Sequence, residues 1–285
     1  GGGTNDLDRV FVDRLRELGW VEGRNVIIEI RRAEGRSEVL STLAADLVNR
    51  RVDVIVTSGT TSIRAARQAT DTIPIVMAGA GDPVASGFVK SLARPGGNIT
   101  GVSLLGHEIV PKTLSLLHEA VPRAKRIDLL ANAANPANEF FGRVTVDAAQ
   151  ALGIESRLIE IRKPDDLESA IAATPAHALF ALPDPMFGLH AKRLADAAIR
   201  RRLPLATFGR LYVEAGSFMS YAVNFDEVFR TAANYTDRIL RGGNPAELPV
   251  EQPRQYELIF NQKTARTLRL TIPQPLLHRA DRIIE

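Results

Sequence analysis

The protein has 285 residues, of which 45% are hydrophobic and 24% charged, a composition that fits one large globular domain or two small ones and excludes a disordered or collagen-like chain. The 36 Lys and Arg residues nearly balance the 33 Asp and Glu residues, so the formal charge of +3 does not favour a nucleic acid partner. The absence of cysteine excludes disulfides, thiolate metal sites and a cysteine nucleophile.

No apolar run in the sequence reaches the roughly 20 residues that a membrane helix needs. The first residues, Gly1 to Asp6, have neither the basic start nor the apolar core of a signal peptide. We therefore expect that any targeting segment was removed or never existed.

Short β-branched runs alternate with segments of helical period through most of the chain, which is typical of parallel β/α units. In the first half this pattern predicts four helices, at 7–18, from Ser37 as the cap through 48, at 61–69 and at 84–93. It predicts strands at 26–30, 52–56, 73–77 and 98–102.

The second half repeats the alternation. Its predicted helices are 110–121, 136–152, 165–173, 189–201 and 225–240, and its predicted strands are 126–130, 154–161, 178–182, 205–208 and 217–221. The tail carries five prolines, which favour extended crossovers over further β/α winding, followed by short helices at 263–268 and 275–284.

The two halves look alike, because each has a helix that ends at a glycine, Gly19 or Gly153, and leads into a strand. The second half also has a strand, 126–130, before its first helix, whereas the first half begins in a glycine-rich loop. We therefore expect an interior strand ahead of Gly1. The pattern as a whole predicts an α/β protein of two doubly wound parallel-sheet lobes joined by a hinge.

In such a sheet the functional loops follow the carboxyl ends of the strands. Residues Ser58, Gly59, Thr60 and Thr61 follow the strand at 52–56, and their hydroxyls and N–H groups could hold a carboxylate or phosphate, although helix capping explains them about as well. The loop from Ala78 to Pro83 permits close backbone approach and lets Asp82 cap the next helix, but position 84 is Val, so it is not a dinucleotide fingerprint.

The strand-end loops of the second half are also polar. Asn132 and Asn135 lie beside a helix start, where turn formation is an equal explanation. Asp184, between two prolines, is placed to receive a ligand ammonium, although a turn aspartate is the commoner role. Phe208 and Tyr221 supply either aromatic walls or core, and Asn224 follows the last strand.

The sequence lacks the nucleophile-elbow, P-loop, zinc-protease and calcium-loop motifs. The pair His107-Glu108 lies too far from His118-Glu119 to share one metal ion. We therefore expect no catalytic residues, no metal and no cofactor.

Several strings, in order along nearly the whole chain, resemble the ABC-transporter substrate-binding proteins that include tryptophan- and phenylalanine-binding members. The most specific is Leu-Ala-Arg-Pro-Gly-Gly-Asn at 92–98. The other strings are 17–26, 53–60, 73–76, 81–84 and 248–253.

The resemblance implies a periplasmic-binding-protein type I-like fold without catalysis. The N-terminal lobe would comprise 1–104 plus 224–252, and the C-terminal lobe 105–223 plus 253–285. It implies export, behind a signal peptide, to the periplasm or to the cell surface as a lipoprotein. The partners would be ABC permease subunits and a small carboxylate-bearing solute, most readily an aromatic or branched amino acid, bound in the cleft between the lobes.

Carried over by the resemblance, the ligand-binding residues would be Gly3, Thr4, Asn5, Ser58, Gly59, Thr60, Thr61, Ala78, Asp82, Asn132, Asn135, Asp184, Phe208, Tyr221 and Asn224. The solute carboxylate would meet residues 58–61, an ammonium would meet Asp184, and Phe208 or Tyr221 would stack on an apolar side chain. Two alternatives remain, the ligand-sensing effector domain of a regulator and a small-molecule α/β enzyme. The first would need a DNA-reading head and the second a positioned base, and the sequence displays neither.

Overall fold

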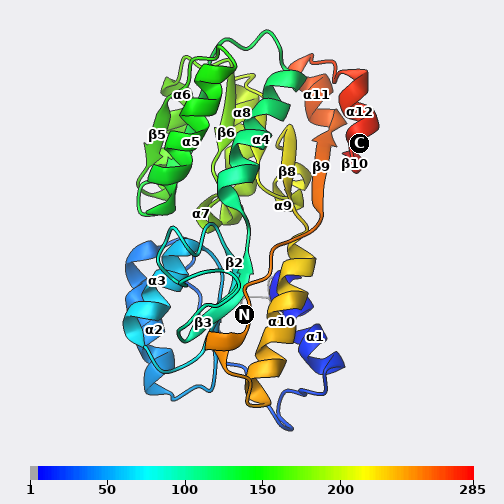
Figure 1. The fold of residues 1–285 in the computed structure, drawn as a ribbon. Coiled ribbons are helices and arrows are strands. Elements are labelled where there is room, and N and C mark those ends of the chain that lie inside the picture. The colour runs from blue at the N-terminus through cyan, green and yellow to red at the C-terminus, as the bar shows by residue number, and fades with distance from the viewer. Residues whose placement is uncertain (1–5) are drawn as a thin grey trace. The chain divides into compact units, whose positions relative to one another are not determined.

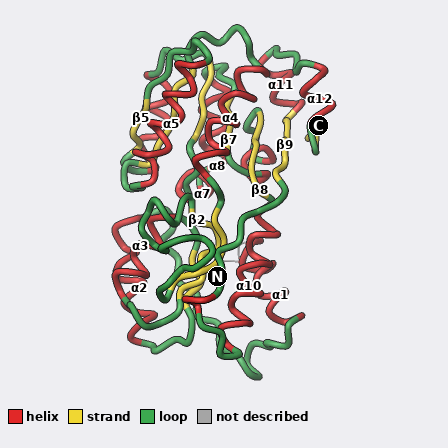
Figure 2. Tube along the Cα trace, viewed as in Figure 1, coloured by secondary structure: helices red, strands yellow, loops and turns green. Residues whose placement is uncertain are grey.

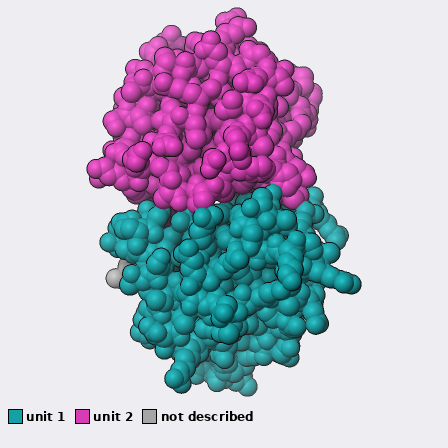
Figure 3. Space-filling model, turned by 60° about the vertical axis from the view of Figure 1, so that its left-hand side comes forward, with its two compact units in different colours: residues 1–104, 225–254 teal, residues 105–224, 255–285 magenta. Residues whose placement is uncertain are grey.

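The computed structural model describes residues 6–285 and divides the chain into two compact units. Unit 1 comprises Gly1–Leu104 and Phe225–Arg254, and unit 2 comprises Leu105–Asn224 and Gln255–Glu285 (Figures 1 and 3). The candidate ligand residues Gly3, Thr4 and Asn5 lie outside the described part of the chain. Within that part, no helix is both long and apolar enough to cross a membrane.

Unit 1 is built on a parallel sheet with the order β1-β2-β3. Its strands are β1 (Ile55–Thr57), β2 (Ile75–Ala80) and β3 (Ile99–Ser103), and its helices are α1 (Asp6–Glu17), α2 (Leu40–Asn49), α3 (Thr60–Ala69) and α10 (Phe225–Leu240), with 3-10 turns η1 (Ser37–Val39) and η3 (Pro245–Glu247). Every residue of β2 is buried because the sheet is covered on both faces. Met77 packs in a cluster with Ile63 of α3, whereas Val76 packs in a second cluster with Tyr235 of α10.

Two elements predicted for unit 1 are wrong. Residues 27–30 form no strand, and the connection from α1 to α2 that contains them is drawn mostly as loop in Figure 2. Val26 makes only an isolated bridge to Glu22. The expected helix at 84–93 is a series of turns, because Gly87 adopts a φ of +68°, which ends the helical path. Ser37 lies within η1 and is not its N-cap, which is Arg36.

Unit 2 is built on a seven-stranded sheet with the order β10-β9-β8-β7-β6-β4-β5. Its strands are β4 (Ile127–Asn132), β5 (Leu158–Ile161), β6 (Ala178–Ala181), β7 (Leu205–Thr207), β8 (Met219–Val223), β9 (Tyr256–Asn261) and β10 (Arg282–Ile284). Its helices are α4 (Gly106–Ala120), α5 (Ala137–Ala151), α6 (Leu167–Ala173), α7 (Pro185–Leu189), α8 (Ala191–Arg200), α9 (Arg210–Glu214), α11 (Gln262–Leu268) and α12 (Gln274–Arg279), with the 3-10 turn η2 (Pro164–Asp166).

Alternate residues of the central strands of unit 2 enter two separate cores, as the period of two in a strand requires. Leu129 and Phe180 pack in the cluster that includes α4 and α5, and Leu130 and Leu179 pack in the cluster that includes α6 and α8. The sheet is therefore doubly wound, as the sequence predicts.

The tail of unit 2 differs from the expectation. Its proline-rich stretch leads into β9, which pairs antiparallel with β8, and β10 takes the place of the end of the helix expected at 275–284. The strand expected at 217–221 is β8, two residues later, so Tyr221 lies inside a strand instead of at its end. The short helices α7 and α9 were not predicted.

Candidate functional site

The carboxyl edge of the unit 2 sheet brings together three candidate residues that are up to 52 positions apart in the sequence. Strands β4 and β6 are parallel neighbours, and the bond from Leu182 N–H to the Leu130 carbonyl (2.9 Å) extends their pairing. Asn132 is the last residue of β4, and Asp184 follows β6 by three positions. Parallel neighbours end at the same edge of a sheet, so the two side chains meet there.

Asp184 is the centre of this group. Its Oδ1 accepts hydrogen bonds from Asn132 Nδ2 (3.0 Å) and from the N–H of Met186 (2.8 Å), the latter capping α7. Its Oδ2 accepts from Asn135 Nδ2 (2.8 Å). The carboxylate is thus held by two side-chain amides and one main-chain amide.

The partners of the Asp184 carboxylate are all neutral, although the side chain is buried. Burial raises the pKa of this carboxyl above its ordinary value, and the hydrogen bonds from Asn132, Met186 and Asn135 oppose that rise. No cation among residues 6–285 forms an ion pair with it. Among the described residues the carboxylate is thus satisfied by neutral donors alone.

A second buried carboxylate in the same sheet shows the contrast. Asp128 lies near the amino end of β4 and is fully buried, yet it accepts from Arg126 Nε (3.0 Å) and Arg157 Nε (3.1 Å) as well as from the Thr174 hydroxyl. Its charge is compensated by the chain itself. Asp128 is therefore a structural carboxylate, and Asp184 is the one that lacks a counter-charge.

Sequence reasoning missed two residues of this group. Asn138 Nδ2 donates to the carbonyl of Asn132 (3.0 Å), and the Tyr212 hydroxyl donates to the carbonyl of Asp184 (3.2 Å). The three-residue spacing of Asn132, Asn135 and Asn138 could have identified the first of these. Tyr212 lies on the unpredicted helix α9, so no sequence pattern pointed to it.

The group made of residues 58–61 is assembled in unit 1 at the start of α3. Gly59, with a φ of +85°, is the N-cap and has no side chain to satisfy the first amides of the helix. The first helical bond runs from Ile63 N–H to the Gly59 carbonyl (3.1 Å). Thr60 is buried, while Ser58 and Thr61 are partly exposed. This helix N-terminus has the polarity that suits an anion.

The loop after β2 begins later than predicted, since β2 continues to Ala80. Ala78 is therefore a buried strand residue that packs with Ala232 and Tyr235 of α10. Asp82 lies in the loop, where its Oδ1 accepts from the N–H groups of Val84 (3.1 Å) and Ala85 (2.9 Å) and holds a turn.

The aromatic candidates take different places in unit 2. Phe208 is only 3% exposed and belongs to the buried interior. Tyr221 is partly buried and stacks on Tyr256, with ring centroids 5.8 Å apart and planes at 28°. Asn224 Nδ2 donates to Glu257 Oε1 (2.9 Å). The part of these three residues in binding stays a prediction.

Between positions 6 and 285 no three His, Cys, Asp or Glu side chains are grouped so that they could hold a metal ion. The polar groups that remain at the edge of unit 2 are amides and one carboxylate, a set suited to a small organic solute.

Comparison with known families gives one match over nearly the whole chain. A family model described as "ABC transporter substrate binding protein" matches residues 6–284. A curated relative, the tyrosine-binding protein of Clostridioides difficile, is 25% identical over 264 residues, which are 90% of this chain and 75% of the relative.

Comparison with solved structures gives the same architecture. A conserved domain protein from Vibrio cholerae is 28% identical with a TM-score of 0.91, and the match covers 97% of this chain and 94% of the other. The L-Trp complex of an ABC domain from Streptococcus pneumonia is 22% identical with a TM-score of 0.89, and the match covers 99% of this chain and 97% of the other. At that identity the second likeness is one of fold.

Proposed function

This chain belongs to the family of ABC transporter substrate binding proteins, and we propose that its solute is a free α-amino acid with an aromatic or branched side chain. The family is a class of solute-binding proteins. We further propose that the chain is exported, hands the solute unchanged to a membrane permease and performs no reaction on it.

The observation that carries the proposal is the buried Asp184 carboxylate, whose described partners are all neutral amides. An ammonium group is a compact cation with donors that fit a carboxylate, and a hydrogen bond between charged groups is roughly twice as strong as a neutral one. Oδ2 accepts one hydrogen bond, from Asn135, and a carboxylate oxygen has room for a second donor. A solute ammonium at Oδ2 would supply the counter-charge that the chain does not.

For the solute carboxylate we propose the start of α3 in unit 1. Gly59 leaves the first amides of that helix without a side-chain cap, and Ser58 and Thr61 add hydroxyl donors beside them. The start of α3 is thus the place in unit 1 that best suits a carboxylate.

The aromatic preference rests on the tyrosine-binding relative and on the stacked pair Tyr221 and Tyr256. Both of these rings are partly buried, whereas Phe208 has little exposed surface to offer. We therefore favour Tyr221 over Phe208 as the side chain that contacts an aromatic solute.

Thermal unfolding in the presence of candidate solutes tests the proposal. L-Tyrosine, L-tryptophan, L-phenylalanine and L-leucine should each be compared with the deaminated acid that keeps the same side chain. A solute at about 100 times its Kd stabilises the folded state by about 2.7 kcal/mol, which is readily measured as a rise in Tm. Stabilisation by the deaminated acids but not by the amino acids would refute it.

Mass spectrometry of the recovered solute separates binding from catalysis. An α/β enzyme would return a chemically altered compound, whereas a binding protein returns the compound that was added. Recovery of an altered solute would therefore contradict the proposed role.

A further inference from the structure

Positive charge gathers at the amino edge of the unit 2 sheet. Four connections lead into the strands there, 121–126 before β4, 152–157 before β5, 174–177 before β6 and 200–204 before β7. They contain one acid, Glu155, and seven cations, which are Arg123, Lys125, Arg126, Arg157, Arg200, Arg201 and Arg202. Even with the buried Asp128 included, the net charge of this edge is +5, whereas that of the whole chain is +3.

The four connections lie side by side, because β5, β4, β6 and β7 are consecutive parallel neighbours. Main-chain hydrogen bonds join them directly. Glu155 N–H donates to the Lys125 carbonyl (2.9 Å), and His177 N–H donates to the Arg126 carbonyl (2.9 Å). Neighbouring strands are about 4.8 Å apart, so the edge from β5 to β7 is about 15 Å wide. The seven cations thus share one surface, the basic edge.

Most of the charge on the basic edge is not compensated by the chain. Arg126 and Arg157 pair with the buried Asp128, and Arg126 also lies 3.7 Å from Glu155. The other five cations are exposed and form no ion pair with any residue from 6 to 285: Arg123, Lys125, Arg200, Arg201 and Arg202. These five charges face solvent.

Helix ends account for the positions of some of these cations but not for their charge. Helix α8 ends at Arg200, where a cation suits the carbonyl end of the helix. Arg201 Nη2 donates to the carbonyl of Thr174, which follows α6 (3.4 Å). Both are contacts with neutral carbonyl groups, so the net charge of the basic edge is unchanged by them.

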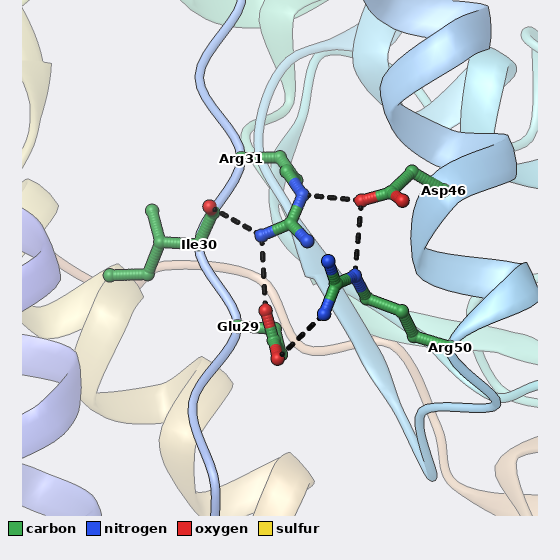
Figure 4. A network of polar contacts seen from close by, with 5 residues as sticks. All are labelled: Glu29, Ile30, Arg31, Asp46 and Arg50. Atoms are coloured by element: carbon green, nitrogen blue, oxygen red, sulfur yellow. Dashed lines mark hydrogen bonds and ion pairs between the residues drawn. The ribbon is translucent and has the colours of Figure 1, made fainter.

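The matching connections of unit 1 lack this excess. The segments 50–54, 70–74 and 94–98, which precede β1, β2 and β3, contain three cations and two acids. Arg50 donates to Asp46 (3.3 Å) and to Glu29 (3.3 Å), and both acids also accept from Arg31 (2.6 and 3.1 Å), which closes a ring of four charges (Figure 4). The arginine cluster of unit 1 is therefore neutralised by the chain, whereas the basic edge is not.

We propose that the basic edge is a docking surface for a bilayer that contains anionic phospholipids. Exposed Lys and Arg side chains are attracted to the negative surface potential of such a bilayer, and each of them contributes to the attraction. Leu152, the C-cap of α5, lies in the connection 152–157 and is 39% exposed. An aliphatic side chain among cations is a combination that suits the interface of a bilayer.

A nucleic acid fits the basic edge less well. The four connections contain no Phe, Tyr or Trp on which a base could stack. Helices α4, α5, α6 and α8 end at this edge, so none of them presents its first turn to a groove of DNA. The basic edge also lies at the opposite end of the parallel strands from Asp184, so the proposal does not depend on which solute is bound.

Cosedimentation with vesicles tests the proposal. The 285-residue protein is mixed with phosphatidylcholine vesicles that either contain or lack phosphatidylglycerol, at low and at high ionic strength. We expect binding to the vesicles with phosphatidylglycerol alone, and we expect high salt to release the protein because it screens exposed charges. The variant Arg200→Gln/Arg201→Gln/Arg202→Gln should bind these vesicles roughly 100-fold more weakly.

The matched control is Arg24→Gln/Arg51→Gln/Arg64→Gln, which removes the same charge from exposed positions of unit 1 and should bind the vesicles nearly as well as the wild type. If the first variant does not fold, Arg123→Gln/Lys125→Gln takes its place, with an expected loss of roughly 30-fold.

Three results would overturn the proposal. They are no binding of the wild type to phosphatidylglycerol vesicles, an equal loss in the unit 1 control, and tighter binding to a DNA duplex than to the vesicles. Amino-acid affinity, measured by titration of the same variants without vesicles, should be unchanged. A failure of vesicle binding is thereby distinguished from a failure of the proposed solute binding.

Discussion

Replacing Asp184 by asparagine removes the charge at the centre of the candidate site and changes few atoms. In the structure Oδ1 accepts two hydrogen bonds, from Asn132 and Met186, and Oδ2 accepts one, from Asn135. An asparagine that keeps its oxygen at Oδ1 retains the first two bonds. Its amide nitrogen then faces the Asn135 amide, and neither group can accept from the other.

The expected loss of affinity follows from the ammonium contact. A hydrogen bond that involves a charged group contributes roughly 1.5 to 3 kcal/mol, so an amino acid should bind the Asp184→Asn variant about 10 to 150 times more weakly. The upper part of this range is favoured because Asp184 is buried, where an ionic contact is screened little by solvent.

Isothermal titration with L-tyrosine and with 3-(4-hydroxyphenyl)propionate measures the effect. The second compound has the same ring and carboxylate but no ammonium, so its affinity should be similar for the wild type and the variant. Asp128→Asn is the matched control, because it removes a buried carboxylate that Arg126 and Arg157 already compensate. It should lower the free energy of unfolding by about 1 to 3 kcal/mol and leave the affinity unchanged.

The reasoning fails if the two compounds lose affinity equally in the Asp184→Asn variant. That result would mean that the substitution disturbs the Asn132 and Asn135 amides and not an ammonium contact. An unchanged affinity for tyrosine would remove Asp184 from the site altogether.

Three other outcomes follow from the structure. Because burial raises the pKa of Asp184 in the folded protein, the contribution of this carboxyl to stability is present below about pH 4 and is lost as the pH rises through the folded pKa. Thermal unfolding measured across this pH range should show the wild type losing stability relative to Asp184→Asn. Parallel curves for the two proteins would contradict this. Ser58→Ala should weaken carboxylate binding by roughly 1.5 kcal/mol in the same titration, and no loss would exclude that hydroxyl. Gly101→Ala should lower the free energy of unfolding, measured by chemical denaturation, by more than about 2 kcal/mol, because the added Cβ would overlap the backbone of Met77. Gly153→Ala, which has open space around the added Cβ, should lower it by about 1 kcal/mol. Equal losses in the two variants would refute the overlap.

The helices and strands that were predicted well are those that the hydrophobic periodicity of their own segment determines. The helix at 225–240 has its bounds right to the residue, and α3 begins one position before the prediction. The strands at 98–102 and 178–182 are also placed within one residue at each end, because they are short apolar runs bounded by polar turns.

The predictions that were wrong concern segments whose structure is not determined by their hydrophobic pattern alone. The run at 26–30 is β-branched, but a strand needs a partner for its main chain, and within the described residues the run has none beyond one bridge. Residues 84–93 have an apolar helical period that the positive φ of Gly87 overrides. Strand β9 was missed because the neighbouring prolines were given more weight than the run from Tyr256 to Asn261.

The candidate site also has a part that the local sequence predicts and a part that depends on distant residues. The predicted ends of the strands at 126–130 and 178–182 placed Asn132, Asn135 and Asp184 in strand-end loops, and the structure joins the three side chains by hydrogen bonds. What the sequence could not supply is the absence of a cation beside Asp184, because a counter-charge can come from any part of the chain. Asp128 has its counter-charges from Arg126 and from Arg157, which is 29 positions away.

The difference between Asp128, which has counter-charges, and Asp184, which has none among the described residues, bears on solute binding. A buried carboxylate without a cation destabilises the empty protein, since desolvation favours its neutral form and nothing in the described chain offsets the charge. A solute ammonium removes this cost only when it is bound, so the free energy it offsets adds to the binding of amino acids and not to that of deaminated acids. The same carboxylate therefore lowers the stability of the empty protein and discriminates between solutes, and measuring both effects on one variant would show whether they have one origin.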